Sequence, residues 1–159
     1  MSEWGVFSTV AGGATAALLG LLFVAVSIRV EVIASSVELR NRAAQTGVLF
    51  LAGLLASLLL VIPEQKRWLG IEFLVLAGAT GATILALGRK ADRAATRSRL
   101  AHLLDAATPN LTTCFLLATA GLILLLGQEW GLYLFAAAVM VVLVGGTANA
   151  WLLLVGVTE

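Results

Sequence analysis

Hydrophobic residues fill five long stretches of this chain, and charged residues are confined to the short segments between them. No Asp, Glu, Lys or Arg occurs within residues 4–28, 43–63, 73–88, 106–128 and 130–158. About 20 apolar residues are enough to cross the hydrocarbon core of a bilayer as a helix. A chain in lipid must satisfy its own backbone N–H and C=O groups, so each stretch is expected to be helical. The pattern predicts an all-α, polytopic integral membrane protein. Its single domain covers 1–159, with spans at about 6–28, 43–62, 68–88, 109–127 and 130–155.

The first helix is predicted to continue beyond the membrane into the cytoplasm. An apolar stripe at helical spacing follows the first span, made of Val26, Val30, Ile33 and Val37. Residues three and four apart share one face of a helix, so this stripe is typical of an amphipathic extension. We expect the extension to end at a turn near Arg40–Arg42.

The third helix is also predicted to extend into the cytoplasm. Arg89, Arg93 and Arg97 stand four residues apart directly after the third span. The extension is expected to end before Thr108. Threonine is a favoured N-cap residue and proline is favoured at the first helical position. We therefore predict that Thr108 caps the fourth helix and that Pro109 begins it.

Composition and charge agree with a membrane location and set an orientation. The chain is 60% hydrophobic and 12% charged, whereas soluble domains carry about 25% charged residues. The first and third connections hold eight of the ten Lys and Arg residues, and the second holds Lys66 and Arg67. Because the basic side is usually cytoplasmic, the N-terminus is predicted outside and the C-terminus inside. Trp4, Trp68 and Trp130 begin the first, third and fifth spans, so they would share the outer interface.

The sequence offers little material for catalysis. His102 and Cys114 are the only histidine and cysteine, and they fall in a cytoplasmic segment and a span. One of each cannot assemble a structural zinc site. No paired carboxylates lie within a span, and no glycine-rich phosphate loop follows a strand. We predict neither an enzyme nor a bound metal or cofactor. Nucleic-acid binding is also disfavoured, because the basic third connection is short and lacks interleaved aromatic residues.

Several polar side chains occur within or beside the spans. Ser27, Thr83 and Asn149 belong to the cytoplasmic half by depth, and Glu31 lies one turn below Ser27. Gln45, Thr46, Thr112 and Thr113 reach the same half. These groups could line a polar pathway across the membrane. They could equally form hydrogen bonds between packed helices, which contribute about 0.6 kcal/mol each on average.

Glu72 is the one ionisable residue placed within an apolar span. An intramembrane carboxylate is by default a candidate functional group, so Glu72 joins the pathway candidates. Its position in the first turns of a helix gives an alternative interpretation. There the helix dipole favours a negative charge, and the side chain can reach the interface.

Small residues and basic residues suggest what the protein contacts. Gly12, Ala16 and Gly20 are spaced by four in the first span, and Gly145 shares a face with Asn149 in the fifth. Such spacing lets helices approach closely, so we expect close packing there and a homo-oligomer. The basic residues Arg89, Arg93 and Arg97 either bind anionic lipid head groups or only orient the chain.

The first span resembles that of a group of small multi-span bacterial membrane proteins. Gly20 to Ser27 reads Gly-Leu-Leu-Phe-Val-Ala-Val-Ser, and Trp4 precedes the helix. Some members of that group are loosely labelled modulators of a membrane protease. The resemblance covers residues 4–28, implies a bacterial cytoplasmic membrane, and carries over no catalytic residue.

Two functions follow from these observations. The first is a small oligomeric channel or transporter for ions or small solutes. The alternative is a non-transporting adaptor or modulator that contacts another membrane protein through its helices.

Overall fold

Six α-helices make up the part of the chain that the computed structural model describes, which is residues 2–62, 66–92 and 99–155. The helices are α1 (Ser2–Ile28), α2 (Val30–Ser35), α3 (Val37–Val61), α4 (Lys66–Asp92), α5 (Arg99–Leu125) and α6 (Gly131–Val155). No strand occurs within these described ranges. The predicted all-α class is therefore confirmed.

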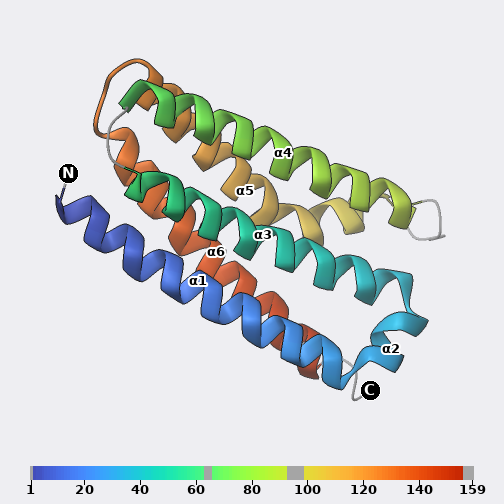
Figure 1. The fold of residues 1–159 in the computed structure, drawn as a ribbon. Coiled ribbons are helices and arrows are strands. Elements are labelled where there is room, and N and C mark those ends of the chain that lie inside the picture. The colour runs from blue at the N-terminus through green and yellow to red at the C-terminus, as the bar shows by residue number, and fades with distance from the viewer. Residues whose placement is uncertain (1, 63–65, 93–98, 156–159) are drawn as a thin grey trace.

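The five long helices run alternately up and down in one bundle (Figure 1). The starts of α1, α4 and α6 lie at one end, here called the N-terminal end, and their last turns lie toward the opposite, C-terminal end (Figure 1). Helix α3 contacts each of the other five helices. The most extensive helix pairs are α1 with α3 and α4 with α5, and α6 packs against α5, α3 and α1. The bundle thus consists of two antiparallel helix pairs, α1 with α3 and α4 with α5. The pairs meet where α3 contacts α4, and α6 packs against both pairs.

Four of these helices are long and apolar enough to cross a bilayer. The stretches are Glu3–Ile28, Val37–Val61, Arg67–Arg89 and Gly131–Trp151. A fifth apolar stretch, Asn110–Leu125, is the part of α5 whose side chains the structure describes. Length and composition alone therefore mark four candidate spans in the described chain.

The predicted cytoplasmic extension of the first helix is wrong as a continuous helix. Helix α1 ends at Ile28, and Arg29 leaves the helical conformation with φ −114° and ψ 28°. The chain then forms the six-residue helix α2, which turns aside from α1 (Figure 1). The turn falls at Ser36 rather than near Arg40–Arg42, because Ser36 is extended and its side chain accepts a hydrogen bond from the Leu39 N–H. A serine N-cap therefore starts α3 six residues before the predicted second span.

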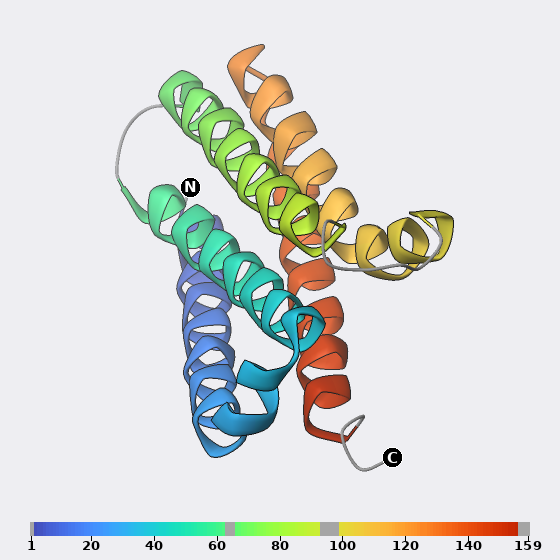
Figure 2. The same cartoon turned by 90° about the vertical axis from the view of Figure 1, so that its right-hand side faces the viewer.

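The expected boundary between the third and fourth helices is also wrong. Helix α4 is described as far as Asp92, four residues past Gly88, and the predicted extension through Arg93 and Arg97 lies outside the described residues. Residues 99–108 belong to α5, which runs through Pro109, so Thr108 is not an N-cap. Proline inside a helix removes one backbone hydrogen bond and clashes with the preceding turn, which bends the helix. Figure 2 shows the first turns of α5 turning away from the rest of that helix.

The hairpin between α5 and α6 is closed by a glycine. Gly127 has φ +82°, a left-handed conformation that glycine adopts without a side-chain clash. The Gly127 N–H donates to the Leu124 carbonyl and the Gln128 N–H donates to the Ile123 carbonyl. This is the Schellman arrangement that ends a helix and satisfies its last carbonyl groups. It directs the chain back into α6.

The core of the bundle has two parts. The larger lies toward the N-terminal end and includes Phe73, Leu117 and Phe135, all fully buried. The smaller lies toward the C-terminal end and is built around Phe50 and Val142. Rings of Phe73 and Phe135 lie 5.3 Å apart between centroids, which joins α4 to α6. Large apolar side chains therefore fill the interior in both halves.

Candidate functional site

Amide side chains of α3 and α5 meet between the helices in the C-terminal half of the bundle. The Asn110 Nδ2 donates a hydrogen bond of 3.3 Å to the Gln45 Oε1. One turn earlier in α3, the Asn41 Nδ2 donates a bond of 3.3 Å to the Leu87 carbonyl oxygen of α4. We call Asn41, Gln45 and Asn110 the amide cluster. It links three helices through side chains that carry no charge.

The local sequence explains why these side chains gather. Asn41 and Gln45 are four residues apart, so both lie on the face of α3 that meets α4 and α5. Asn110 is buried, and it follows Pro109 at the point where α5 rejoins the bundle. Burying a polar group is costly unless the group is hydrogen-bonded. The hydrogen bond between Asn110 and Gln45 therefore favours the arrangement in which α3 and α5 hold these two side chains together.

Fully buried threonines lie beside the amide cluster on both helices. Thr46 follows Gln45, and its Oγ1 donates to the Arg42 carbonyl oxygen at 2.9 Å. Thr113 lies one turn after Asn110. Gln45, Thr46, Thr112 and Thr113 were predicted to reach the same half of the membrane, and of these Thr112 is exposed. Asn110 was not among the predicted polar residues. The signal was available, because Asn110 is the only amide residue in the uncharged stretch before Gln128.

The predicted pathway residues are not brought together within one chain. Ser27 is exposed on α1 and donates to its own helix at the Phe23 carbonyl, 2.8 Å away. Thr83 is exposed on α4 and donates to the Ala79 carbonyl at 2.8 Å. Helices α1 and α4 do not contact each other in the described chain. Each hydroxyl is therefore satisfied by the preceding turn of its own helix.

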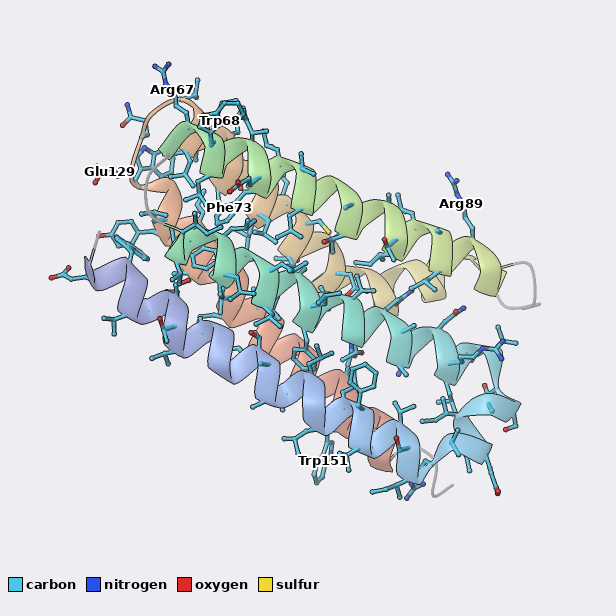
Figure 3. The ribbon with its side chains drawn as sticks, viewed as in Figure 1. Arg67, Trp68, Phe73, Arg89, Glu129 and Trp151 are labelled. Atoms are coloured by element: carbon cyan, nitrogen blue, oxygen red, sulfur yellow. The ribbon has the colours of Figure 1, made fainter. Side chains whose placement is uncertain are left out.

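The remaining pathway candidates lie in three different places. Glu31 is exposed on α2, away from the long helices' interior. Asn149 is half-buried in α6, toward the C-terminal end. Glu72 is half-buried in α4, one turn after Trp68 at the N-terminal end and directly before the buried Phe73 (Figure 3). Glu72 and Asn149 thus lie at opposite ends of the bundle.

The small residues that permit close crossings differ from those expected. Gly12 is buried, and a Cβ placed on it would lie 3.3 Å from the Ser57 Cβ of α3. Ala16 and Gly20 are exposed, and no atom lies within 4 Å of a Cβ on Gly20. Within the chain, the predicted stripe therefore contributes only its first member. The face of α1 that packs within the chain is therefore rotated away from Ala16 and Gly20.

In the last helix the neighbour of the predicted glycine makes the close contact. A Cβ on Gly146 would lie 2.4 Å from the Phe50 Cε1, whereas Gly145 is only half-buried. The closest backbone approach joins α4 to α5. A Cβ on Gly70 would lie 2.6 Å from the Leu125 N and 2.7 Å from the Gly121 carbonyl oxygen. Gly70 thus lets the main chains of α4 and α5 approach closely, as small residues do in membrane helix pairs, whereas Gly146 leaves room for the Phe50 ring.

Hydroxyl groups also connect α1 to α3 near the N-terminal end. The buried Ser8 Oγ donates to the Ser57 carbonyl oxygen, and the Ser57 Oγ donates to the Gly53 carbonyl at 2.8 Å. The Thr15 Cγ2 lies 3.1 Å from where a Cβ on Gly53 would be. This junction is a tight interhelical contact built from small residues.

A chain of aromatic rings runs inward from the N-terminal end. Trp4 contacts Tyr133 at 5.0 Å and Phe7 at 5.9 Å, with rings nearly perpendicular. Phe7 contacts Phe135 at 6.0 Å, and Phe135 continues to Phe73. Edge-to-face pairs of this kind contribute about 0.5–1.5 kcal/mol beyond their buried area. The rings therefore hold α1, α4 and α6 together at this end.

Charged residues lie at the ends of the helices. Figure 3 shows Arg67, Trp68 and Glu129 at the N-terminal end and Arg89 near the other end of α4. Arg89 is exposed, whereas Arg93 and Arg97 lie outside the described residues. Among the described residues, no three His, Cys, Asp or Glu side chains come together in a group that could hold a metal ion.

The fold defines an all-α protein with four helices long and apolar enough to span a membrane. Comparison of the chain with protein-family models, with curated proteins and with solved structures finds no match. The geometry of the chain itself is therefore the basis for a functional proposal.

Proposed function

We propose that the protein is inserted in a bacterial cytoplasmic membrane through five spans, with the N-terminus outside. The bias of eight basic residues against two supports this orientation. The span between α4 and α6 is the part of α5 that includes Asn110–Leu125, and α5 packs against both of these helices.

Within that membrane we propose a non-transporting adaptor or modulator that acts through helix contacts. One observation carries this proposal: several polar side chains between the described helices donate hydrogen bonds to a neighbouring helix. Asn110 pairs with Gln45, Asn41 with Leu87, and Ser8 with Ser57. The core between them is filled by large apolar side chains such as Phe50 and Phe135. Such an interior suits a rigid scaffold better than a hydrated path.

Outward faces of α1 and α4 would be available to another membrane helix. Exposed small residues on α1 are Gly13, Ala16, Ala17 and Gly20. Exposed small residues on α4 are Gly78, Ala79 and Ala82. Small side chains allow a second helix to pack closely against these faces. That helix would belong to a partner protein or to another copy of this chain.

Ion flux and cysteine accessibility at Asn149 distinguish the adaptor from a channel. The purified protein is reconstituted into liposomes, and flux is measured under a salt gradient. In a Cys114→Ala background, Asn149→Cys and Val142→Cys are treated with a water-soluble thiol reagent. Val142 is the control, because it is fully buried in the same helix. The reagent needs water at the thiol, since the reactive thiolate forms only in a hydrated environment.

The adaptor predicts no flux above empty liposomes and no labelling at either position. Flux together with labelling of Asn149→Cys alone would contradict the adaptor. That result would favour a path between copies of the chain, because Ser27 and Thr83 lie on outward faces of helices that do not contact each other in the described chain.

A further inference from the structure

The chain makes a corner between α1 and α3 at the C-terminal end of the bundle (Figure 1). Helix α1 ends at Ile28, α2 follows from Val30 to Ser35, and Ser36 caps α3. Helix α2 contacts both long helices and turns aside from them. We call residues 28–42 the α2 corner. A short helix at the end of a membrane bundle lies at the level of the membrane surface.

The burial of its side chains shows that α2 is amphipathic. Successive residues are turned by about 100° around a helix. Ile33 is only 6% exposed and faces the bundle, whereas Glu31 and Ser35 are exposed on the opposite side. Val30 and Val32 lie on the two flanks between these faces, and they are 55% and 39% exposed. The helix therefore presents apolar flanks beside the bundle and a polar face away from it.

This division fits the boundary between head groups and acyl chains. An amphipathic helix in the membrane plane buries its apolar side at that boundary and keeps its polar side in water. Two other exposed side chains mark the same level. Ile28, the last residue of α1, is 75% exposed, and Trp151 in the last turns of α6 is 65% exposed (Figure 3). Tryptophan favours the membrane interface, so this end of the bundle carries an interfacial residue of its own.

The described charges at this end are mainly positive. Four arginines and two glutamates give a net charge of 4 − 2 = +2, from Arg29, Arg40, Arg42, Arg89, Glu31 and Glu38. Arg42 already has an interaction within the protein. Arg29 directly precedes α2, and Arg40 is exposed one turn after Ser36. Each basic residue near an anionic membrane surface contributes an attraction that corresponds to about a five-fold gain in binding.

We propose that the α2 corner is an interfacial anchor that binds anionic phospholipid head groups, with Arg29 and Arg40 as the cations. Val30 and Val32 are seated at the head-group boundary, and Glu31 and Ser35 face water. This inference rests on the proposed membrane insertion, and it does not depend on whether the protein is an adaptor or a channel.

The position of α2 is tested on the full chain in lipid nanodiscs. In the Cys114→Ala background, an environment-sensitive fluorophore is attached at Val30→Cys or at Ser35→Cys, which are five residues and about 140° apart around the helix. The Val30 site is expected to be quenched by lipid that is spin-labelled on its acyl chain and protected from acrylamide, a neutral quencher in water. The Ser35 site is expected to be quenched by acrylamide. Equal acrylamide quenching at both sites would overturn the interfacial position of α2.

Head-group binding is measured at the Val30 site. Quenching by spin-labelled phosphatidylglycerol is compared with quenching by spin-labelled phosphatidylcholine. We expect stronger quenching by the anionic lipid, and we expect this selectivity to fall by up to about five-fold for each of Arg29→Gln and Arg40→Gln. Arg29→Lys keeps the charge and is expected to keep the selectivity.

Arg67→Gln is the matched control, because Arg67 is an exposed arginine at the opposite end of the bundle (Figure 3). It is expected to leave the selectivity at the Val30 site unchanged. A selectivity ratio of one, or an equal loss in Arg67→Gln and Arg40→Gln, would overturn the head-group site. Failure of the protein to insert into nanodiscs at all would instead overturn the proposed function, and this inference with it.

Discussion

At the scale of single residues, the position of each glycine around its helix matters more than its presence in a stripe. Gly70 and Gly78 are both in α4, eight residues apart. A Cβ on Gly70 would meet the backbone of α5 at 2.6 Å, whereas a Cβ on Gly78 meets nothing within 4 Å. Backbone atoms cannot move aside as the end of a side chain can, so only one of these sites requires glycine.

We therefore predict opposite effects of the same substitution at these two sites. Gly70→Ala should lower the free energy of unfolding in detergent by about 1–3 kcal/mol through overpacking. Gly78→Ala should leave it unchanged or raise it by up to about 1 kcal/mol, because alanine is the better helix former. Thermal and denaturant unfolding of both variants measures the difference. Equal stability of the two variants would contradict the close α4–α5 crossing.

At the scale of secondary-structure elements, the amide cluster joins α3 to α5 at a point where α5 bends. A double-mutant cycle with Gln45→Ala and Asn110→Ala tests this link. We predict a coupling of about 0.6 kcal/mol, and at most about 1.7, as measured for hydrogen bonds between membrane helices. Thr83→Ala is the control, because Thr83 bonds only to the preceding turn of its own helix in the described contacts. Strictly additive effects of Gln45→Ala and Asn110→Ala would mean that the amides do not stabilise each other.

At the scale of the whole molecule, the arrangement predicts one orientation in the membrane. Trp4, Trp68 and Trp130 belong to the N-terminal end of the bundle, and Arg89 lies near the C-terminal end. Aromatic residues favour interfaces, and basic residues favour the cytoplasmic side. A fluorescent protein fused after Glu159 should therefore be bright, and alkaline phosphatase fused there should be inactive. As a control, phosphatase fused within the connection at residues 63–65 should be active. The reverse pattern would invert the topology.

The sequence alone was sufficient to predict the long helices, because hydrophobicity and backbone hydrogen bonding are properties of a local stretch of chain. The long apolar stretches in 6–28 and 130–155 predicted helices, because a helix of this length satisfies its backbone N–H and C=O groups within a single segment. These conclusions need only the order of residues along the chain.

The tertiary structure decided which face of each helix is used and where the helices break. Helical periodicity placed Gly12 and Gly20 on one face, but only the position of α3 shows that Gly12 packs and Gly20 does not. Local patterns favoured a helix through Arg29 and a cap at Thr108, whereas the structure bends at Arg29, caps α3 at Ser36 and runs α5 through Pro109. Apolar residues surround these helices almost evenly, so hydrophobicity does not select the packed face. Shape complementarity and interhelical hydrogen bonds select it, and both depend on residues far apart in the chain.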